Sequence, residues 1–371
     1  MFTVKNKKYM RSLFSVFALA TLLTGAGIAN AQVVRNTLHN FVDVGGNLNR
    51  TDFTTLAFPA AAGSPIRWRT TGNPANPAPG AAFQREFDYG VLGSATVQGD
   101  SIVVADYTGD NKSEVAVWRD QATANGQPGV FYVSQFPTGT GGITLERAVP
   151  FGTGFSDVPG VQGDYDGDGK DDYAVVRVVG SGLVWYIMNS VNSTVKAISF
   201  GSLTGQTGVA VFPGADFNAD GRDELIVISR NAAGNLNTFF IGDANTGQGV
   251  ITRSFGNYNT DYTFAPEDYT GDGRADFLSS RQTDGANQTF YLGNSQNTTI
   301  QTFSFGIADP LFAGDGDSPV RGDFDGDGRH DICVWRPSNQ TFYYISSQFS
   351  NIQSQKAGAE TDFPIGSFGL Y

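Results

Sequence analysis

A glycine-bent acidic loop that returns at a steady spacing constrains this chain more than any other feature. The stretch from Gly163 to Arg177 reads GDYDGDGKDDYAVVR, with carboxylates at loop positions 1, 3, 5 and 9 counted from Asp164. Glycine at position 6 supplies the bend that turns such side chains toward one point. Several hard oxygen ligands around one point suit Ca²⁺ better than a transition metal. The stretch therefore predicts a calcium loop followed by an apolar strand.

The loop occurs five times in the same phase. The copies read DYTGDNKSE, DYDGDGKDD, DFNADGRDE, DYTGDGRAD and DFDGDGRHD, and their first residues lie 58, 52, 52 and 55 residues apart. Repeats of this length are typical of propeller blades. One acidic turn would be explained by the turn preference of Asp and Gly, but five copies in one phase favour metal sites.

Each loop is followed by the same order of short β-type segments. An apolar run ends in Arg, an aromatic run follows, and a Phe-Gly or similar step closes most units, as in SFG at 199–201, 254–256 and 304–306. About four strands per unit predict an all-β fold, a β-propeller of four-stranded blades. The repeated Arg is expected to be structural within its blade, with lining of one face of the ring as the alternative. These residues are Arg119, Arg177, Arg230, Arg281 and Arg336.

The two ends of the repeat array predict how the ring closes. A worn copy at 41–59 keeps Asp43 and Asp52 but replaces inner ligand positions, and the sequence leaves open whether the loop at 43–52 binds metal. At the far end, Phe363-Pro364-Ile365-Gly366 resembles the segment that enters the last loop. The tail is therefore expected to supply the first strand of the first blade. Six blades are predicted, and seven are the alternative.

The loop pattern, the Phe-Gly step and the blade-length period resemble FG-GAP/VCBS-type repeats, the calcium-loop blades of integrin α-chain propellers. The resemblance covers about residues 40–371. It implies side-chain ligands at positions 1, 3, 5 and 9 and a backbone carbonyl at position 7, with the position 7 side chain free to point to solvent. About five Ca²⁺ sites follow. Their residues are Asp106, Thr108, Asp110, Lys112 and Glu114; Asp164, Asp166, Asp168, Lys170 and Asp172; Asp216, Asn218, Asp220, Arg222 and Glu224; Asp268, Thr270, Asp272, Arg274 and Asp276; and Asp323, Asp325, Asp327, Arg329 and Asp331.

An EF-hand does not fit these loops, because it requires a bidentate acid at position 12 and flanking helices. In this chain the last acid stands at position 9, and β-type runs lie on both sides.

The N-terminus has the pattern of a secretory signal peptide. Four basic residues precede the apolar run 13–29, and Ala29-Asn30-Ala31 offers a cleavage site. A retained anchor is the alternative; no later stretch is expected to span a membrane. Residues 1–31 are thus predicted to be removed, leaving one propeller domain over 32–371. Its units are expected near 37–95, 96–155, 156–208, 209–260, 261–315 and 316–371.

Charge and composition exclude several classes of function. The formal net charge is −12 and would become −16 without residues 1–31, which argues against a nucleic-acid partner. The single Cys333 permits no intrachain disulfide and is expected to be a buried thiol. His330 is expected to face solvent, and Asp323 of Arg321-Gly322-Asp323 is expected to serve its metal loop rather than adhesion. Two His and one Cys leave little material for nucleophilic triads.

These observations favour a secreted or surface-exposed, calcium-binding scaffold that binds a protein or glycan ligand without enzymatic activity. Adhesion propellers suggest this role by resemblance, although a fold does not fix a function. A carbohydrate-active propeller, whether lectin-like or a lyase or hydrolase, is one alternative. An envelope structural protein is another. The ligand, the binding face and the oligomeric state stay open.

Overall fold

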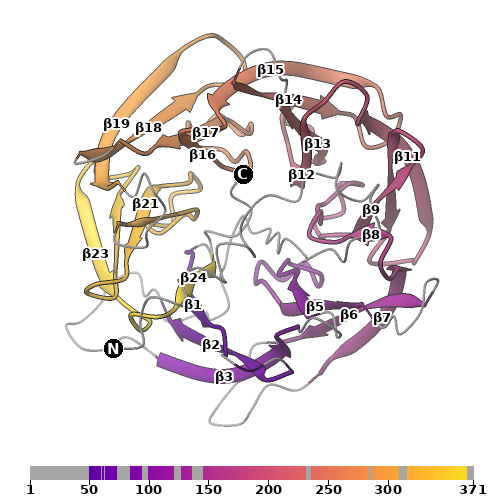
Figure 1. Cartoon of the computed structure of the whole chain (residues 1–371), viewed down its shortest axis with the longest axis horizontal. Helices are drawn as coiled ribbons and strands as arrows, with labels where there is room; N and C mark the ends of the chain where they lie inside the picture. The colour runs from indigo at the N-terminus through magenta and orange to yellow at the C-terminus, as the bar shows by residue number, and fades with distance from the viewer. Residues whose placement is uncertain are drawn as a thin grey trace.

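The chain forms a ring of small sheets around a central axis (Figure 1). The computed structural model describes residues 50–59, 61, 63–72, 84–93, 99–120, 127–135, 145–230, 235–283, 286–308 and 316–365. The predicted signal peptide, the first part of the worn loop (43–49) and the Pro-rich segment 73–82 lie outside these ranges. No α-helix occurs within them, so none there could cross a membrane.

Six four-stranded antiparallel sheets make up the described ring, as predicted, and the strands of each sheet are named from the axis outward. Blade 1 contains β24 (Phe363–Pro364), β1 (Phe53–Ala57), β2 (Pro65–Thr71) and β3 (Gln84–Val91). Blade 2 contains β4 (Asp100–Ile102), β5 (Val115–Asp120), β6 (Pro128–Ser134) and β7 (Arg147–Thr153). Blade 3 contains β8 (Asp157–Val158), β9 (Tyr173–Val179), β10 (Gly182–Met188) and β11 (Val195–Ser202).

The second half of the ring repeats the same order. Blade 4 contains β12 (Gly208–Ala215), β13 (Glu224–Arg230), β14 (Leu236–Gly242) and β15 (Gly249–Asn257). Blade 5 contains β16 (Asp261–Thr263), β17 (Phe277–Arg281), β18 (Asn287–Gly293) and β19 (Ile300–Ile307). Blade 6 contains β20 (Ser318–Val320), β21 (Ile332–Arg336), β22 (Thr341–Ile345) and β23 (Ile352–Lys356).

The C-terminal tail closes the ring, as the sequence predicts. Strand β24 pairs antiparallel with β1, with Leu56 opposite Phe363 and Thr55 opposite Pro364. Ile365 is buried in the apolar core beside blade 1. The first blade therefore takes its innermost strand from the other end of the chain, and this strand covers an edge that would otherwise be unpaired.

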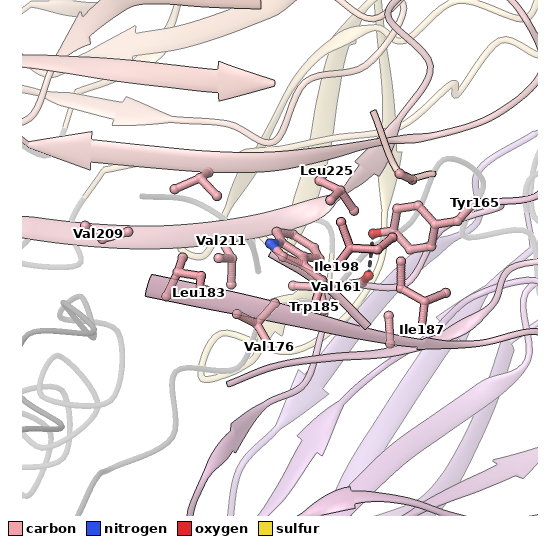
Figure 2. Close-up of a cluster of buried hydrophobic side chains, with 13 residues drawn as sticks. Val161, Tyr165, Val176, Leu183, Trp185, Ile187, Ile198, Val209, Val211 and Leu225 are labelled. Atoms are coloured by element: carbon pink, nitrogen blue, oxygen red, sulfur yellow. Dashed lines mark hydrogen bonds between the residues drawn. The ribbon is translucent and has the colours of Figure 1, made fainter. Parts of the chain in front are cut away.

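The core lies between neighbouring blades, where alternating strand residues from two sheets meet. Between blades 3 and 4, Val176 and Trp185 of one sheet pack in one cluster with Val211 and Leu225 of the next (Figure 2). The indole N–H of Trp185 donates to the Phe200 carbonyl at 3.1 Å, so this large side chain is buried without an unpaired donor. Cys333 is buried in β21, the second strand of blade 6, and burial raises the pKa of its thiol. This confirms the predicted core thiol.

In blades 2, 3, 5 and 6 the repeated Arg pairs with an Asp that also accepts an N–H from the preceding blade. In blade 3, Arg177 forms two bonds with Asp157 at 2.5 and 2.8 Å and lies 4.7 Å above the Tyr186 ring. Asp157 also accepts the Thr153 N–H at 2.6 Å, just past the Phe-Gly step of the preceding blade. The same Asp–Arg pair occurs as Asp100–Arg119, Asp261–Arg281 and Asp317–Arg336. The Arg is thus structural within its blade, as expected.

Two blades modify this arrangement. In blade 4, Gly208 stands opposite Arg230, where the other blades have Asp, and Arg230 lies over the Tyr258 ring at 4.9 Å. In blade 1, the Arg comes from the next strand outward, since Arg69 of β2 pairs with Asp362 beside the closing strand. The carboxylate of Asp362 also accepts Thr55 Oγ1 at 2.8 Å.

We expect Asp362→Ala to lower the free energy of unfolding by about 2 to 4 kcal/mol, because it leaves Arg69 and Thr55 of blade 1 without their acceptor next to the closing strand. Urea denaturation would measure the loss. Glu360→Ala, at an exposed position in the same segment, is the control and should stay within about 0.5 kcal/mol of the parent. Equal losses in the two variants would contradict the assigned role of Asp362 in closure.

Candidate metal centres

The five acidic loops lie at one end of blades 2 to 6, between the innermost strand and the second strand. We call this side the loop face; it comprises residues 106–114, 164–172, 216–224, 268–276 and 323–331. The hairpins between the third and fourth strands reach the same side, because Asn189 and Ser190 contact Asp166 and Asp172.

Each loop is folded by the aspartate at its first position. Asp164 accepts the Gly167 N–H at 2.7 Å on one oxygen and the Gly169 N–H at 2.8 Å on the other. Both glycines have positive φ, 80° and 85°, which supports the predicted bend at position 6. Asn111 takes position 6 in the loop at 106 with φ 61°, a conformation that Asn tolerates better than most residues.

Three of the loops gather acidic oxygens closely enough for one cation. The groups have ligand atoms within 4.8 Å of one another. They are Asp106, Asp110 and Glu114; Asp164, Asp166 and Asp168; and Asp323, Asp325 and Asp327. Within the described residues, the loops at 216 and 268 form no such group of three acids.

The acid at position 9 accepts backbone N–H groups in every loop, and where it is an Asp it also accepts one from the neighbouring hairpin. Glu114 and Glu224 accept the N–H of position 2 at 2.8 Å in both cases, and Asp331 accepts it at 2.7 Å. Asp172, which is shorter, accepts the Ser190 N–H of the neighbouring hairpin at 3.0 Å. Asp276 and Asp331 accept the equivalent Ser295 and Ser347 N–H groups at 3.1 and 2.7 Å. The fourth predicted side-chain ligand is therefore shared between its loop and a hairpin in the three Asp loops.

Without a bound metal ion, burial disfavours the charged form of the acids in these loops. The pKa of Glu114 is raised to about 8, chiefly by burial and then by Asp106. The pKa of Asp331 is likewise raised to about 8, by burial and then by Asp325. Burial also raises the pKa of Asp172, Glu224 and Asp323 to about 7 and of Asp276 to about 6. A divalent cation would supply the missing countercharge.

One orphaned atom tests whether a cation fits. The side-chain oxygen of Asn218, at ligand position 3, is buried and has no hydrogen-bond partner in the described part of the chain. Its amide nitrogen donates to Glu224 at 2.6 Å, which holds the amide group in place. A buried oxygen without a donor is costly, and a bound cation would satisfy it. The residues therefore fit a hard cation.

The basic residues at position 7 extend across the preceding loop. A Cβ built on Gly109 would lie 2.8 Å from Lys170 Cγ, and one on Gly167 would lie 2.9 Å from Arg222 Cγ. The same contact joins Gly271 to Arg329. These stems lie against the loop of the preceding blade, although Arg222 is exposed and Lys170 and Arg329 are partly exposed. The close contact favours a small residue at position 4, which is Gly in these three loops.

His330 at position 8 is buried, so the expectation that it faces solvent is wrong. Its backbone N–H donates to the Asp268 carbonyl at 2.8 Å, and its ring meets the Tyr269 ring edge-on. Burial, and then the positive charge of Arg321, lowers the His330 pKa to about 3. Position 8 lies at the contact between two blades, which the sequence of one loop does not reveal.

The Arg321-Gly322-Asp323 tripeptide is buried as well. Arg321 is fully covered and pairs with Glu267 at 2.9 Å, while Asp323 holds the backbone of its own loop. Neither charge is available for adhesion, in agreement with the sequence analysis.

Hairpin residues complete the loops, and sequence reasoning missed them. Asn189 donates to Asp166, Asn294 donates to Asp272 at 3.3 Å, and Ser346 donates to Asp325 at 2.5 Å. The available signal was the pair Asn-Ser or Ser-Ser directly after the aromatic strand in blades 3, 5 and 6. These residues orient acids at positions 3 and 5.

Comparison with known proteins finds the FG-GAP-like repeat over residues 216–279 and 268–334. Solved structures with a similar course include TolB from Acinetobacter baumannii, at 14% identity and TM-score 0.45, covering 83% of this chain and 65% of that one. The Dos1 propeller matches at 10% identity and TM-score 0.36, with 84% and 74% covered. A rhamnogalacturonan lyase PL11 from Bacillus licheniformis matches at 13% and 0.37, with 80% and 71% covered. No curated protein matches significantly.

Stability without metal should fall as the pH rises from about 6.5 to 8. The loop acids have folded-state pKa values of about 6 to 8, above their ordinary values near 4, so the folded protein binds more protons than the unfolded chain. His330 acts in the opposite direction, but only below its ordinary pKa of 6.5. Melting temperatures in chelator across this window would measure the effect, and calcium should flatten or reverse it. A metal-free melting temperature that rises with pH would contradict the assignment.

Proposed function

We propose that this FG-GAP repeat β-propeller protein binds Ca²⁺ in its five acidic loops and acts as a rigid, secreted scaffold for a protein or glycan partner. The gathering of three acids within 4.8 Å in each of three loops carries the metal part of the proposal. Clustered carboxylates with raised pKa values and an orphaned amide oxygen support it.

Calcium suits the ligand chemistry of every loop. The candidate donors are carboxylate, amide, hydroxyl and backbone oxygens, and sulfur and imidazole are absent from the predicted ligand positions. Calcium accepts six to eight such oxygens in flexible geometry, whereas Mg²⁺ prefers to keep several waters. Side chains at positions 1, 3, 5 and 9 and the carbonyl at position 7 would hold the ion. The bound ion would neutralise acids that otherwise repel one another.

The repeated architecture supports a scaffold rather than an enzyme. Acidic loops recur at equivalent places in blades 2 to 6, which suits a structural pin better than a catalytic centre. Arg321, Glu267 and His330 form a cluster of charged and titratable side chains, but they lie between blades 5 and 6 and are buried from solvent. A shallow depression of about 250 Å³ on blade 1 is lined by Arg67 and Asp88, which pair with each other.

Secretion is proposed from the basic and apolar N-terminal segment and its small-residue cleavage site. A protein with one buried thiol gains no stability from disulfides outside the cell, so bound calcium would be a suitable substitute. N-terminal sequencing of the exported protein should begin at residue 32. Recovery of an intact N-terminus in the membrane fraction would favour the anchor instead.

Calcium should raise the melting temperature well above its value in chelator. If free Ca²⁺ is about tenfold above Kd, each site adds about 1.4 kcal/mol, and five sites add up to about 7 kcal/mol. Differential scanning fluorimetry with and without chelator would measure the shift. Equal melting temperatures would refute structural calcium.

The loops at 164 and 323 should bind most tightly, because each has four carboxylates at positions 1, 3, 5 and 9. The loop at 106 should bind more weakly, with Thr108 at position 3. Asp168→Ala and Asp110→Ala each remove the position 5 acid from one loop. Calorimetry should show that the first variant loses a tighter site than the second; the reverse order would overturn the ranking.

The partner is the least constrained part of the proposal. A glycan array and pull-down on the calcium-loaded protein test the scaffold, and a screen against acidic polysaccharides tests the carbohydrate-active alternative. Turnover of a polysaccharide would replace the scaffold by an enzyme. Concentration-dependent assembly in light scattering would favour an envelope structural protein.

A further inference from the structure

We propose that the residue at position 8 of the loops at 164, 216, 268 and 323 belongs to the metal site of the preceding blade, so that neighbouring calcium sites are coupled around the ring. The inference rests on the calcium binding proposed above and assigns residues that are not themselves predicted ligands. It predicts that the five sites do not load independently.

A hydrogen bond links each of the loops at 164, 216, 268 and 323 to the loop before it. The position 8 N–H of Asp171 donates to the Asp106 carbonyl at 2.8 Å, and that of Asp223 donates to the Asp164 carbonyl at 2.8 Å. Ala275 and His330 make the same bond to Asp216 and Asp268, at 2.7 and 2.8 Å. In every case the acceptor is the backbone of the residue whose carboxylate folds the loop. We call this bond the clasp.

Two loops add a second bond in the opposite direction. The Asp171 carboxylate accepts the Asp106 N–H at 2.8 Å, and the Asp223 carboxylate accepts the Asp164 N–H at 2.9 Å. The peptide groups on both sides of the first ligand are then held by one residue of the next blade. Such charge-assisted bonds are about twice as strong as neutral ones.

Asp171 also adds negative charge to two sites. Its carboxylate lies against the backbone N–H of Asp106, and the residue next to it in sequence is Asp172, a predicted ligand of the loop at 164. A carboxylate placed between two cation sites favours loading of both. Its removal should therefore weaken the preceding site even though Asp171 supplies no predicted ligand to it.

Blade 1 completes the sequence of clasps. The Thr51 N–H donates to the Asp323 carbonyl at 2.7 Å, and Thr51 Oγ1 accepts the Asp323 N–H at 2.9 Å. A Cβ on Gly326 would lie 2.7 Å from Arg50 Cγ, the contact that position 7 makes elsewhere. The loop at 323 is thus held by the degenerate loop of blade 1. Its clasp therefore does not require blade 1 to keep a complete set of ligand residues.

Position 8 lies between the ligand positions 7 and 9 of its own loop. A cation bound by those positions would fix the position 8 backbone and, through the clasp, the first residue of the preceding loop. Coupling is therefore expected to run from each loop to the loop before it, and thermodynamic linkage requires the reciprocal effect on affinity.

The test measures one site while its neighbour is disabled. In an Asp168→Ala background, which removes a ligand from the loop at 164, calcium titration is followed through the amide signal of Gly109 in the loop at 106. Adding Asp171→Ala should raise the dissociation constant of that site about three- to tenfold. Asp171→Asn, which keeps an acceptor oxygen without the charge, should give a smaller rise.

Asp223→Ala in the same background is the matched control. It removes the equivalent acid, but the site that this acid supports is already disabled, so the loop at 106 should keep its affinity. An unchanged dissociation constant in the Asp171 variants would overturn the proposal, and so would an equal rise in the Asp223 control. If the parent protein binds no calcium, the proposed function fails instead, and calorimetry on the parent distinguishes the two results.

Discussion

The pairing of Phe363–Pro364 with strand β1 is the constraint on which the ring depends. Each blade buries its faces against two neighbours, so an open ring would leave one sheet face and one sheet edge in water. The two-residue strand is short, but it places Asp362 against Arg69 and Thr55 and Ile365 in the core. The closing contact therefore combines backbone pairing, a buried charge pair and apolar packing, and these involve opposite ends of the chain.

When the ring closes, the acidic side chains of the five loops, which repel one another, lie together on the loop face. The predicted side-chain ligand positions contain 17 of the 36 acidic residues. The backbone partly compensates, since the first aspartate of each loop accepts N–H groups from its own turn. These bonds shape the loop but do not neutralise it, as the raised pKa values of Glu114 and Asp331 show. The four acids of the Asp–Arg pairs differ, because each of these carboxylates has a guanidinium as its partner.

The sequence was sufficient for whatever repeats within a blade. The period of the loops gave the blade length, the Arg at the end of each apolar run identified a structural position, and Phe363-Pro364 indicated closure. Contacts between blades were not accessible, because they join residues about one repeat apart whose relative placement depends on how two sheets pack. His330 illustrates this: within its loop it resembles a solvent-facing turn residue, but the next blade covers it. The hairpin residues Asn189 and Ser346 are an exception within a blade: they were missed because they lie about twenty residues along the chain from the acids that they contact.

The worn first unit separates two roles that the other units combine. It keeps Arg50 and Thr51, which make the position 7 and position 8 contacts with the loop at 323. Its sequence has Gly45 and Asn47 where the best loops have acids. The contact with the neighbouring blade thus persists in a unit whose ligand set is degraded. Blade-to-blade contact is then a requirement of the ring at every interface, whereas a complete set of metal ligands is required only where the loop carries enough buried charge to need an ion.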